Sequence, residues 1–191
     1  KATRPLTNAD GTGSKGPLLC VPPVIDESLV DLSGNIIDSY LAARILDYIR
    51  KELLALKVGF TFETVMSHES KVKFLQDAKE QGYRTYLYFV TTEDPDINVD
   101  RVKQRVKNGG HPVEESKIRE RYFRSMEMLI DAIEVSDRAF LYDNSSNAVD
   151  QSVSYICEVT NGDTLTINPC FKGDFPIWFE KYVLVHLVDE D

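Results

Sequence analysis

The stretch YRTYLYFV, residues 83–90, is the strongest strand signal in the chain and decides the fold that the sequence predicts. It is rich in aromatic and β-branched residues, which favour strands. A second strand is predicted at RAFLYD (138–143), and a short helix at 98–107 and a long one at 113–135 are predicted between them. Strands that alternate with helices of ten or more residues indicate βαβ units, so we expect an α/β fold with a parallel sheet.

The residues before this stretch predict two more helices. Apolar residues spaced three to four apart predict one helix from Ile36 to about Lys57 and another from Ser67 to Gln81. FTFET (60–64), between them, has the pattern of a short buried strand. We therefore expect residues 1–191 to form one domain, with helices on both faces of its sheet.

The C-terminal part has a different pattern. SVSYICEVTNGDTLTIN (152–168) is typical of a β-hairpin that turns at Asn161-Gly162, because Asn-Gly readily takes the positive φ values of a type I′ turn. FPIWFEKYV (175–183) predicts a final short helix. We expect a small C-terminal hairpin appendage at about residues 150–191.

The composition excludes several classes of protein. No apolar run approaches the roughly 20 residues that span a bilayer, and no signal-like apolar core follows the first basic residues. The three cysteines (Cys20, Cys157 and Cys170) lack C-x-x-C spacing, so neither a disulfide framework nor a zinc site is predicted. We expect a cytoplasmic protein without membrane segments.

The charge is unevenly distributed along this acidic chain. The 31 Asp and Glu outnumber the 22 Lys and Arg, which gives a net charge of −9. Residues 101–124 nevertheless hold eight Lys or Arg and three Glu, so this basic island carries +5 and the other residues −14. Such an island suggests a small anionic ligand rather than nucleic acid. The alternative is a solvated helix face.

The arginines of the long predicted helix differ in the direction they face. If Ile118 marks zero and each residue advances about 100°, five apolar residues form one stripe. They are Tyr122, Met126, Leu129, Ile130 and Ile133. Arg119 falls inside this stripe and needs a partner, because a buried unpaired charge is costly. The partner is either a phosphate in a cleft or a structural Glu or Asp. Arg101 and Arg124 have the pattern of solvated surface residues.

The segment NGGH (108–111) joins the two predicted helices. Its glycines permit positive φ and a sharp reversal, so residues at about 98–125 suit a lid that closes over phosphates. His111 is interpreted as a cap or hydrogen-bond partner rather than a general base. Polar residues also follow three predicted strands, at Glu63-Thr64, 91–94 and 143–145, where open parallel sheets bind ligands.

Five segments appear in order between about Ala42 and Ser145, and together they resemble the zeta-toxin-like family of P-loop kinases. They are FxxET, AKxxGY, RVxxRVxxGGHxV, IRxRYxRS and YDNS. The resemblance implies a P-loop NTPase-like fold with a helical lid of arginines, ATP and Mg²⁺ as cofactors, and a small-molecule hydroxyl acceptor. The best-known members phosphorylate UDP-N-acetylglucosamine. It also implies a link to toxin–antitoxin systems, although no antitoxin can be read from one chain.

The resemblance also assigns roles to individual residues. Glu63 and Thr64 would lie near the acceptor substrate. Arg105, with Arg119 or Arg121, would contact the transferred or the β/γ-phosphates. Asn144 would lie near the adenine.

The N-terminal segment departs from the family pattern. A P-loop has the pattern G-x-x-x-x-G-K-[ST], and the nearest match is Gly11-Thr12-Gly13-Ser14-Lys15, where Ser14 and Lys15 stand in the reverse order. Asp26 is the nearest match to the family's catalytic Asp, which takes the proton of the attacking hydroxyl. Three explanations are open: the loop binds phosphate by another lysine route, the chain is a degenerate kinase, or the sequence is incomplete here. The alternative is that this segment is a flexible surface loop.

Two functions from different classes remain after the sequence analysis. The first is an ATP-dependent kinase for a small molecule, with a nucleotide sugar as the candidate acceptor. The second is a pseudokinase that binds a nucleotide or a protein without turnover. RNA binding by the basic island ranks last, because the island lacks aromatic residues suited to base stacking.

Overall fold

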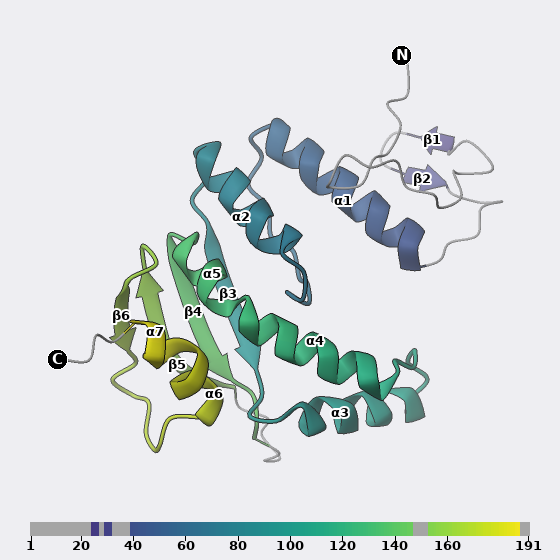
Figure 1. Cartoon of the computed structure of the whole chain (residues 1–191). Helices are drawn as coiled ribbons and strands as arrows, with labels where there is room; N and C mark the ends of the chain where they lie inside the picture. Colours follow the sequence, from purple (N-terminus) through teal and green to yellow (C-terminus); the bar gives the residue numbers. More distant parts are fainter. Residues whose placement is uncertain (1–23, 27–28, 32–38, 147–152, 188–191) are drawn as a thin grey trace. The chain divides into compact units, whose positions relative to one another are not determined.

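The computed structural model describes residues 24–26, 29–31, 39–146 and 153–187 (Figure 1). The chain divides into two compact units, residues 1–62 and 63–191, and each is described by itself. That the whole chain forms one domain stays a prediction. In the described part of the chain, no helix has both the length and the apolar character needed to cross a membrane.

The first unit contains a two-stranded antiparallel sheet and one long helix. Strands β1 (Val24–Asp26) and β2 (Leu29–Asp31) pair in register, with Asp26 opposite Leu29. Helix α1 (Ser39–Ala55) confirms the predicted helix within the residues that are described. It ends just before Lys57, which has a φ of 58°, in the left-handed conformation that often follows a helix.

The predicted strand at FTFET is wrong. Residues 58–66 form no helix or strand, and Phe62 is 37% exposed. Its ring lies 6.2 Å from that of Phe60, and the guanidinium of Arg50 on α1 lies 4.8 Å from its centre. The aromatic rings therefore make local contacts in the first unit, which can replace the burial that a strand would need.

The second unit is built on a four-stranded sheet in the order β3-β4-β5-β6. Strands β3 (Tyr86–Thr91) and β4 (Arg138–Asp143) are parallel, as predicted. Strands β5 (Ser154–Thr160) and β6 (Thr164–Ile167) form the predicted hairpin, with φ of 55° at Asn161 and 85° at Gly162. Because β5 pairs antiparallel with β4, the hairpin extends the main sheet, which is therefore mixed rather than parallel.

The helices of the second unit follow the predicted order with shifted ends. Helix α2 spans Ser70–Glu80, and α3 spans Pro95–Lys107. The long predicted helix is interrupted at Met128 and forms α4 (Glu115–Glu127) and α5 (Leu129–Glu134). The C-terminal residues 177–187 are helical throughout, as α6 (Ile177–Phe179), the π-helical segment η1 (Glu180–Leu184) and α7 (Val185–Leu187).

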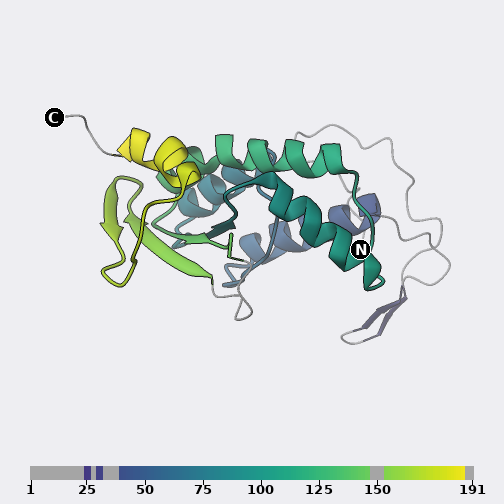
Figure 2. The same ribbon diagram turned by 90° about the horizontal axis from the view of Figure 1, so that it is seen from below.

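The core of this unit lies on one face of the sheet. Phe89, Leu141 and Cys157 of the sheet pack with Leu129 and Ile133 of α5 in one buried cluster. On the same side lie α4 and the C-terminal helical segment (Figure 2). The opposite face is more open, since Tyr88 of β3 is 62% exposed. Within this unit, therefore, helices cover one face of the sheet and not both.

Candidate functional site

The loops that follow β3 and β4 meet at the carboxyl edge of the sheet. The backbone N–H of Asn144 donates to the carbonyl of Thr91 at 2.7 Å. The N–H of Glu93 donates to Oγ of Ser145 at 2.6 Å. Two of the three predicted strand ends are thus joined in space, because parallel neighbours end at the same edge. The third, Glu63-Thr64, follows no strand, and both of its residues are exposed.

Tyr122 attaches helix α4 to the first of these loops. Its hydroxyl is shared between the carbonyls of Thr92, at 2.9 Å, and Glu93, at 3.1 Å. Burial raises the pKa of Tyr122 well above its usual range, and the nearby charge of Glu93 adds to the shift. Tyr122 is therefore a neutral donor that fixes the end of β3.

Asp143 organises the second loop through both oxygens of its carboxylate. Oδ1 accepts the N–H of Ser145, and Oδ2 accepts the hydroxyl of Ser145, each at 2.9 Å. Oδ2 also accepts the indole N–H of Trp178 at 2.9 Å. A carboxylate with several donors fixes the backbone around it, and the residue held between Asp143 and Ser145 is Asn144.

Arg101 joins helix α3 to the same loop. Its Nη2 donates to the carbonyl of Asn144 at 2.7 Å and to that of Ser146 at 3.5 Å. Its interpretation as a solvated surface residue is therefore wrong. Backbone carbonyls 43 and 45 residues further along the chain accept its hydrogen bonds.

Helices α3 and α4 form a hairpin around the Gly109-Gly110 turn. Asp94 caps α3 by accepting the N–H of Asp96 at 2.7 Å, and Gly109 has a φ of 87°. The side chain of Arg105 folds back onto the turn, where Nη2 donates to the carbonyl of His111 at 3.1 Å. A Cβ at Gly110 would lie only 2.7 Å from Cγ of Arg105, so this close approach requires glycine.

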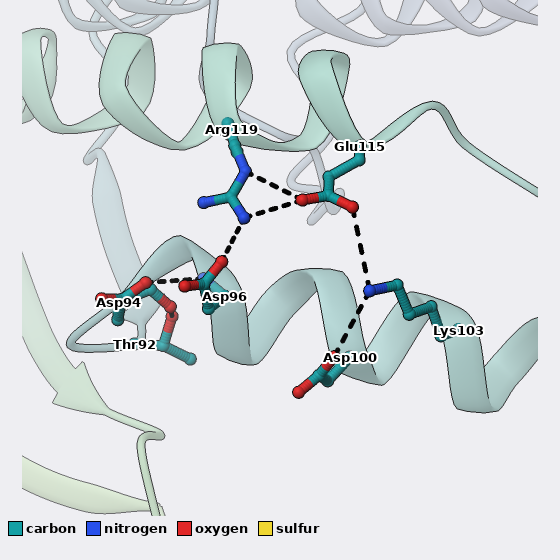
Figure 3. A network of polar contacts seen from close by, with 7 residues as sticks. All are labelled: Thr92, Asp94, Asp96, Asp100, Lys103, Glu115 and Arg119. Carbon is teal, nitrogen blue, oxygen red and sulfur yellow. Dashed lines mark hydrogen bonds and ion pairs between the residues drawn. The ribbon is translucent and has the colours of Figure 1, made fainter.

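Arg119 on α4 is paired with carboxylates from both helices of this hairpin (Figure 3). Its Nη2 contacts Oδ1 of Asp96 on α3 and Oε1 of Glu115 on α4, the latter at 2.8 Å. Nε also donates to Glu115, at 3.2 Å. Nη1 has no hydrogen-bond partner among the residues that the structure describes.

The pairing of Arg119 affects the acidity of its partner. The hydrogen bond from Arg119, together with the charge of Lys103, holds the pKa of Glu115 below its usual value. The same hydrogen bond raises the pKa of Arg119. Of the two partners left open by the sequence, this structure contains the structural carboxylates. The side chain is still 38% exposed, so a phosphate has access to it.

The comparisons with known proteins identify the family. The family model described as zeta toxin matches residues 39–152, which is more than half of the chain. The chain belongs to the zeta toxin family. Membership supports a P-loop kinase-like, ATP-binding protein and, in general terms, a phosphotransferase.

A relative of this zeta toxin family chain occurs in Haemophilus influenzae. That protein, described as uncharacterized, is 35% identical over 65 residues, which cover 34% of this chain and 46% of the relative. The matched part thus spans about half the length of the curated relative. No solved structure matches the chain.

Some of the residues to which the zeta toxin resemblance assigned roles are described by the structure, and others are not. Gly11, Thr12, Gly13, Ser14 and Lys15 lie outside the described residues. Asp26 is the last residue of β1, in the first unit. Arg121 is exposed on α4 without a hydrogen bond or ion pair to another described residue. Arg105, Arg119 and Asn144 all lie in the second unit, on or beside the α3–α4 hairpin.

Two residues of this region, Arg101 and Trp178, were not predicted from the sequence. Only Trp178 carried a usable signal. A buried tryptophan usually needs an acceptor for its indole N–H, and Trp178 is the only tryptophan in the chain. Polar residues at a strand end, such as Asp143, are natural acceptors, but the sequence does not state which one is close.

Proposed function

We propose that this protein is an ATP-dependent kinase that transfers the γ-phosphate of ATP to a hydroxyl of a small molecule. A nucleotide sugar is the first acceptor class to test, since the sequence resembles kinases of UDP-N-acetylglucosamine. Family membership supports the general class of reaction. The choice of acceptor rests on the resemblance alone.

One observation of the structure supports this proposal most strongly. The α3–α4 hairpin carries Arg105, Arg119 and Arg121, and it is joined to the strand-end loops by Arg101 and Tyr122. The hairpin that carries these guanidinium groups is thereby attached to the edge of the sheet where α/β proteins bind ligands. Phosphoryl transfer needs chiefly positioning and charge stabilisation, which such groups supply.

In the proposed site, Asn144 lies near the adenine and the arginines bind phosphate oxygens. The unused Nη1 of Arg119 can donate to a phosphate while Nη2 keeps its carboxylates, or the phosphate can replace them. Gly11, Thr12, Gly13, Ser14 and Lys15 are assigned to the phosphate cradle on their sequence pattern. Glu63 and Thr64, both exposed, are assigned to the acceptor.

The proposed reaction transfers the γ-phosphoryl group directly from ATP to the acceptor hydroxyl. The acceptor oxygen forms a bond to the γ-phosphorus, the bond from that phosphorus to the bridging β–γ oxygen breaks, and ADP leaves. The proton of the hydroxyl passes to the carboxylate of Asp26, which is assigned on its sequence position. Mg²⁺, when bound, would supply positive charge that offsets the charge of the phosphates. No group of three His, Cys, Asp or Glu in the described part of the chain could hold a metal ion by itself.

Calorimetric titration with ATP, with and without Mg²⁺, tests this function at the binding step. We expect saturable binding that is stronger with Mg²⁺, because the metal neutralises phosphate charge. Titration with inorganic triphosphate reports on the arginines without the base. Absence of saturable ATP binding under both conditions would remove the kinase proposal.

A catalytically degenerate pseudokinase is the second candidate function. The reversed order of Ser14 and Lys15 favours it, since a P-loop uses the lysine charge at the earlier position. Such a protein would bind a nucleotide or a protein partner without turnover. Saturable ATP binding with no release of ADP in the presence of acceptors would support this function over the first.

A further inference from the structure

The C-terminal segment is held against the candidate site although it lies outside the part that matches the family. The match ends at residue 152, whereas α6 begins at Ile177. Trp178 is only 2% exposed and packs against Phe89 of β3, with ring centres 6.3 Å apart. The ring of Phe179 contacts the indole edge-on, with ring centres 5.8 Å apart. The indole is thus held rigidly beside the end of the sheet.

Two polar contacts link this segment to the two strand-end loops. The indole N–H of Trp178 donates to Oδ2 of Asp143 at 2.9 Å. The backbone N–H of the preceding residue, Ile177, donates to Oε1 of Glu93, also at 2.9 Å. One turn of the C-terminal helix therefore binds a carboxylate from each loop.

These contacts close a ring of hydrogen bonds. Asp143 accepts the hydroxyl of Ser145, and Ser145 in turn accepts the backbone N–H of Glu93. The carboxylate of Glu93 accepts the backbone N–H of Ile177, and Ile177 is covalently joined to Trp178. Each bond in the ring restrains the next, because moving one member breaks hydrogen bonds at both of its sides.

The ring surrounds the backbone of Asn144 and leaves its side chain available. Asp143 and Ser145 flank this residue, and its own N–H and carbonyl are bound by Thr91 and Arg101. The side-chain amide of Asn144 makes no hydrogen bond to another residue in the described ranges. An amide on a fixed backbone can donate to and accept from a heterocyclic base at the same time.

We infer that Trp178, with Ser145, is a positioning residue that holds Asn144 for recognition of the base of a purine nucleotide. This inference rests on the proposed function, in which Asn144 lies near the adenine. The C-terminal helix thus governs base recognition from outside the family-matched region. In the proposed site Arg105, Arg119 and Arg121 bind the phosphates, and none of the three belongs to this ring of hydrogen bonds.

Two substitutions break the ring at different points. Trp178→Phe keeps an aromatic ring in the core but removes the N–H that Asp143 accepts. Ser145→Ala removes the hydroxyl between Asp143 and Glu93 without touching the core cluster. Phe171→Leu is the matched control. The partly buried side chain of Phe171 packs on the same cluster and stacks on Phe175, but it takes no part in the ring of hydrogen bonds.

The test is calorimetry of ATP, GTP and inorganic triphosphate with the full chain. For Trp178→Phe and Ser145→Ala we expect ATP affinity to fall about tenfold, as loss of a hydrogen bond to a charged group implies. The preference for ATP over GTP should fall in parallel, and triphosphate affinity should stay unchanged. Phe171→Leu should keep the ATP preference.

Three other binding results would overturn the inference, and a fourth would overturn the proposed function as well. Wild-type ATP binding with unchanged affinity and base preference in both variants would overturn this inference alone. An equal loss of ATP and triphosphate affinity in Ser145→Ala would also overturn it, since the ring would then act on the whole site. If the wild type binds triphosphate but shows no preference for ATP over it, base recognition and this inference both fail. If the wild type binds neither, the proposed function fails with them.

Discussion

At the scale of single residues, Arg119 combines a structural and a proposed catalytic role. Its Nη2 is engaged by Asp96 and Glu115, whereas Nη1 is unused within the described residues. Arg124, on the same helix, pairs with Glu120 at 2.8 Å and with no other residue that the structure describes. The two arginines therefore provide a matched comparison on one element.

Arg119→Ala is expected to lower turnover by at least about a hundredfold, because a charge that stabilises the transferred phosphoryl group is lost. Arg124→Ala should leave turnover within about twofold, since exposed ion pairs contribute little. Steady-state kinetics with a verified acceptor measures both. Equal activity of Arg119→Ala and wild type would remove Arg119 from the site.

A second prediction at this scale concerns Asp137 and pH. Oδ2 of Asp137 accepts the N–H of Thr85 at 2.7 Å and its hydroxyl at 3.1 Å. The backbone hydrogen bond from Thr85 lowers the pKa of Asp137 in the folded state. Asp137→Asn should lower the free energy of unfolding at pH 7 by about 1–2 kcal/mol, since the bonds to a charged acceptor are lost.

The sign of the pH dependence follows from the lowered pKa. The stabilisation is complete above the unfolded-state value of about 3.9 and is lost as pH falls through the folded-state pKa. Urea unfolding at pH 7 and below about pH 4 should therefore show a shrinking difference between wild type and Asp137→Asn. Asp77→Asn, in an exposed pair with Lys73, is the control. A difference that grows on acidification would contradict this assignment.

The sequence predicted part of the residue-scale picture. A helical wheel singled out Arg119 as a residue that needs a partner, and the carboxylates of Asp96 and Glu115 provide one. Arg101 lies on the short helix, outside that wheel, and its acceptors are backbone carbonyls in a loop distant in the sequence. Periodicity describes the faces of one element, but it carries no information on what lies opposite each face.

At the scale of elements, local signals predicted the hairpin and the parallel strands well. Asn161-Gly162 takes the positive φ values that the pair suggested, and β4 has the predicted bounds. FTFET failed because its alternation fits a strand while its aromatic rings make local contacts instead. The mixed sheet was also missed, because hairpin signals do not reveal which strand the hairpin will pair with.

The turn of the β5–β6 hairpin allows the cost of backbone strain to be separated from the cost of a close contact. Gly162 has a φ of 85°, and a Cβ there would lie 2.7 Å from Cα of Glu134. Gly82 has a φ of 84° with nothing within 4 Å. Gly82→Ala should cost about 1 kcal/mol through strain alone, and Gly162→Ala clearly more because Glu134 must move.

Thermal or urea unfolding of the two variants separates these effects. The difference between them reports the packing of the hairpin turn against the end of α5, where Glu134 is the last residue. If the two glycine substitutions destabilised the protein equally, the close approach of Gly162 to Glu134 would be absent in solution.

At the scale of the whole molecule, carboxylates just outside the basic island compensate part of its charge. Lys103 pairs with Asp100 and Arg119 pairs with Asp96, and neither Asp is among the three Glu already included in the charge of +5. The island therefore attracts anions less than its charge of +5 suggests, and the proposed phosphate binding is assigned chiefly to Arg105, Arg119 and Arg121. Net charge along the sequence predicted the location of the candidate site but not this compensation, which depends on the packing of α3 against α4.

The central claim is that this member of the zeta toxin family transfers phosphate from ATP. The most direct test follows label from γ-phosphate-labelled ATP and Mg²⁺ into a panel of nucleotide sugars and other hydroxyl compounds, with the full chain. We predict ADP release and label on a hydroxyl acceptor, both strongly reduced in Arg119→Ala. Saturable ATP binding with all label retained in ATP, whichever acceptor is present, would contradict the claim.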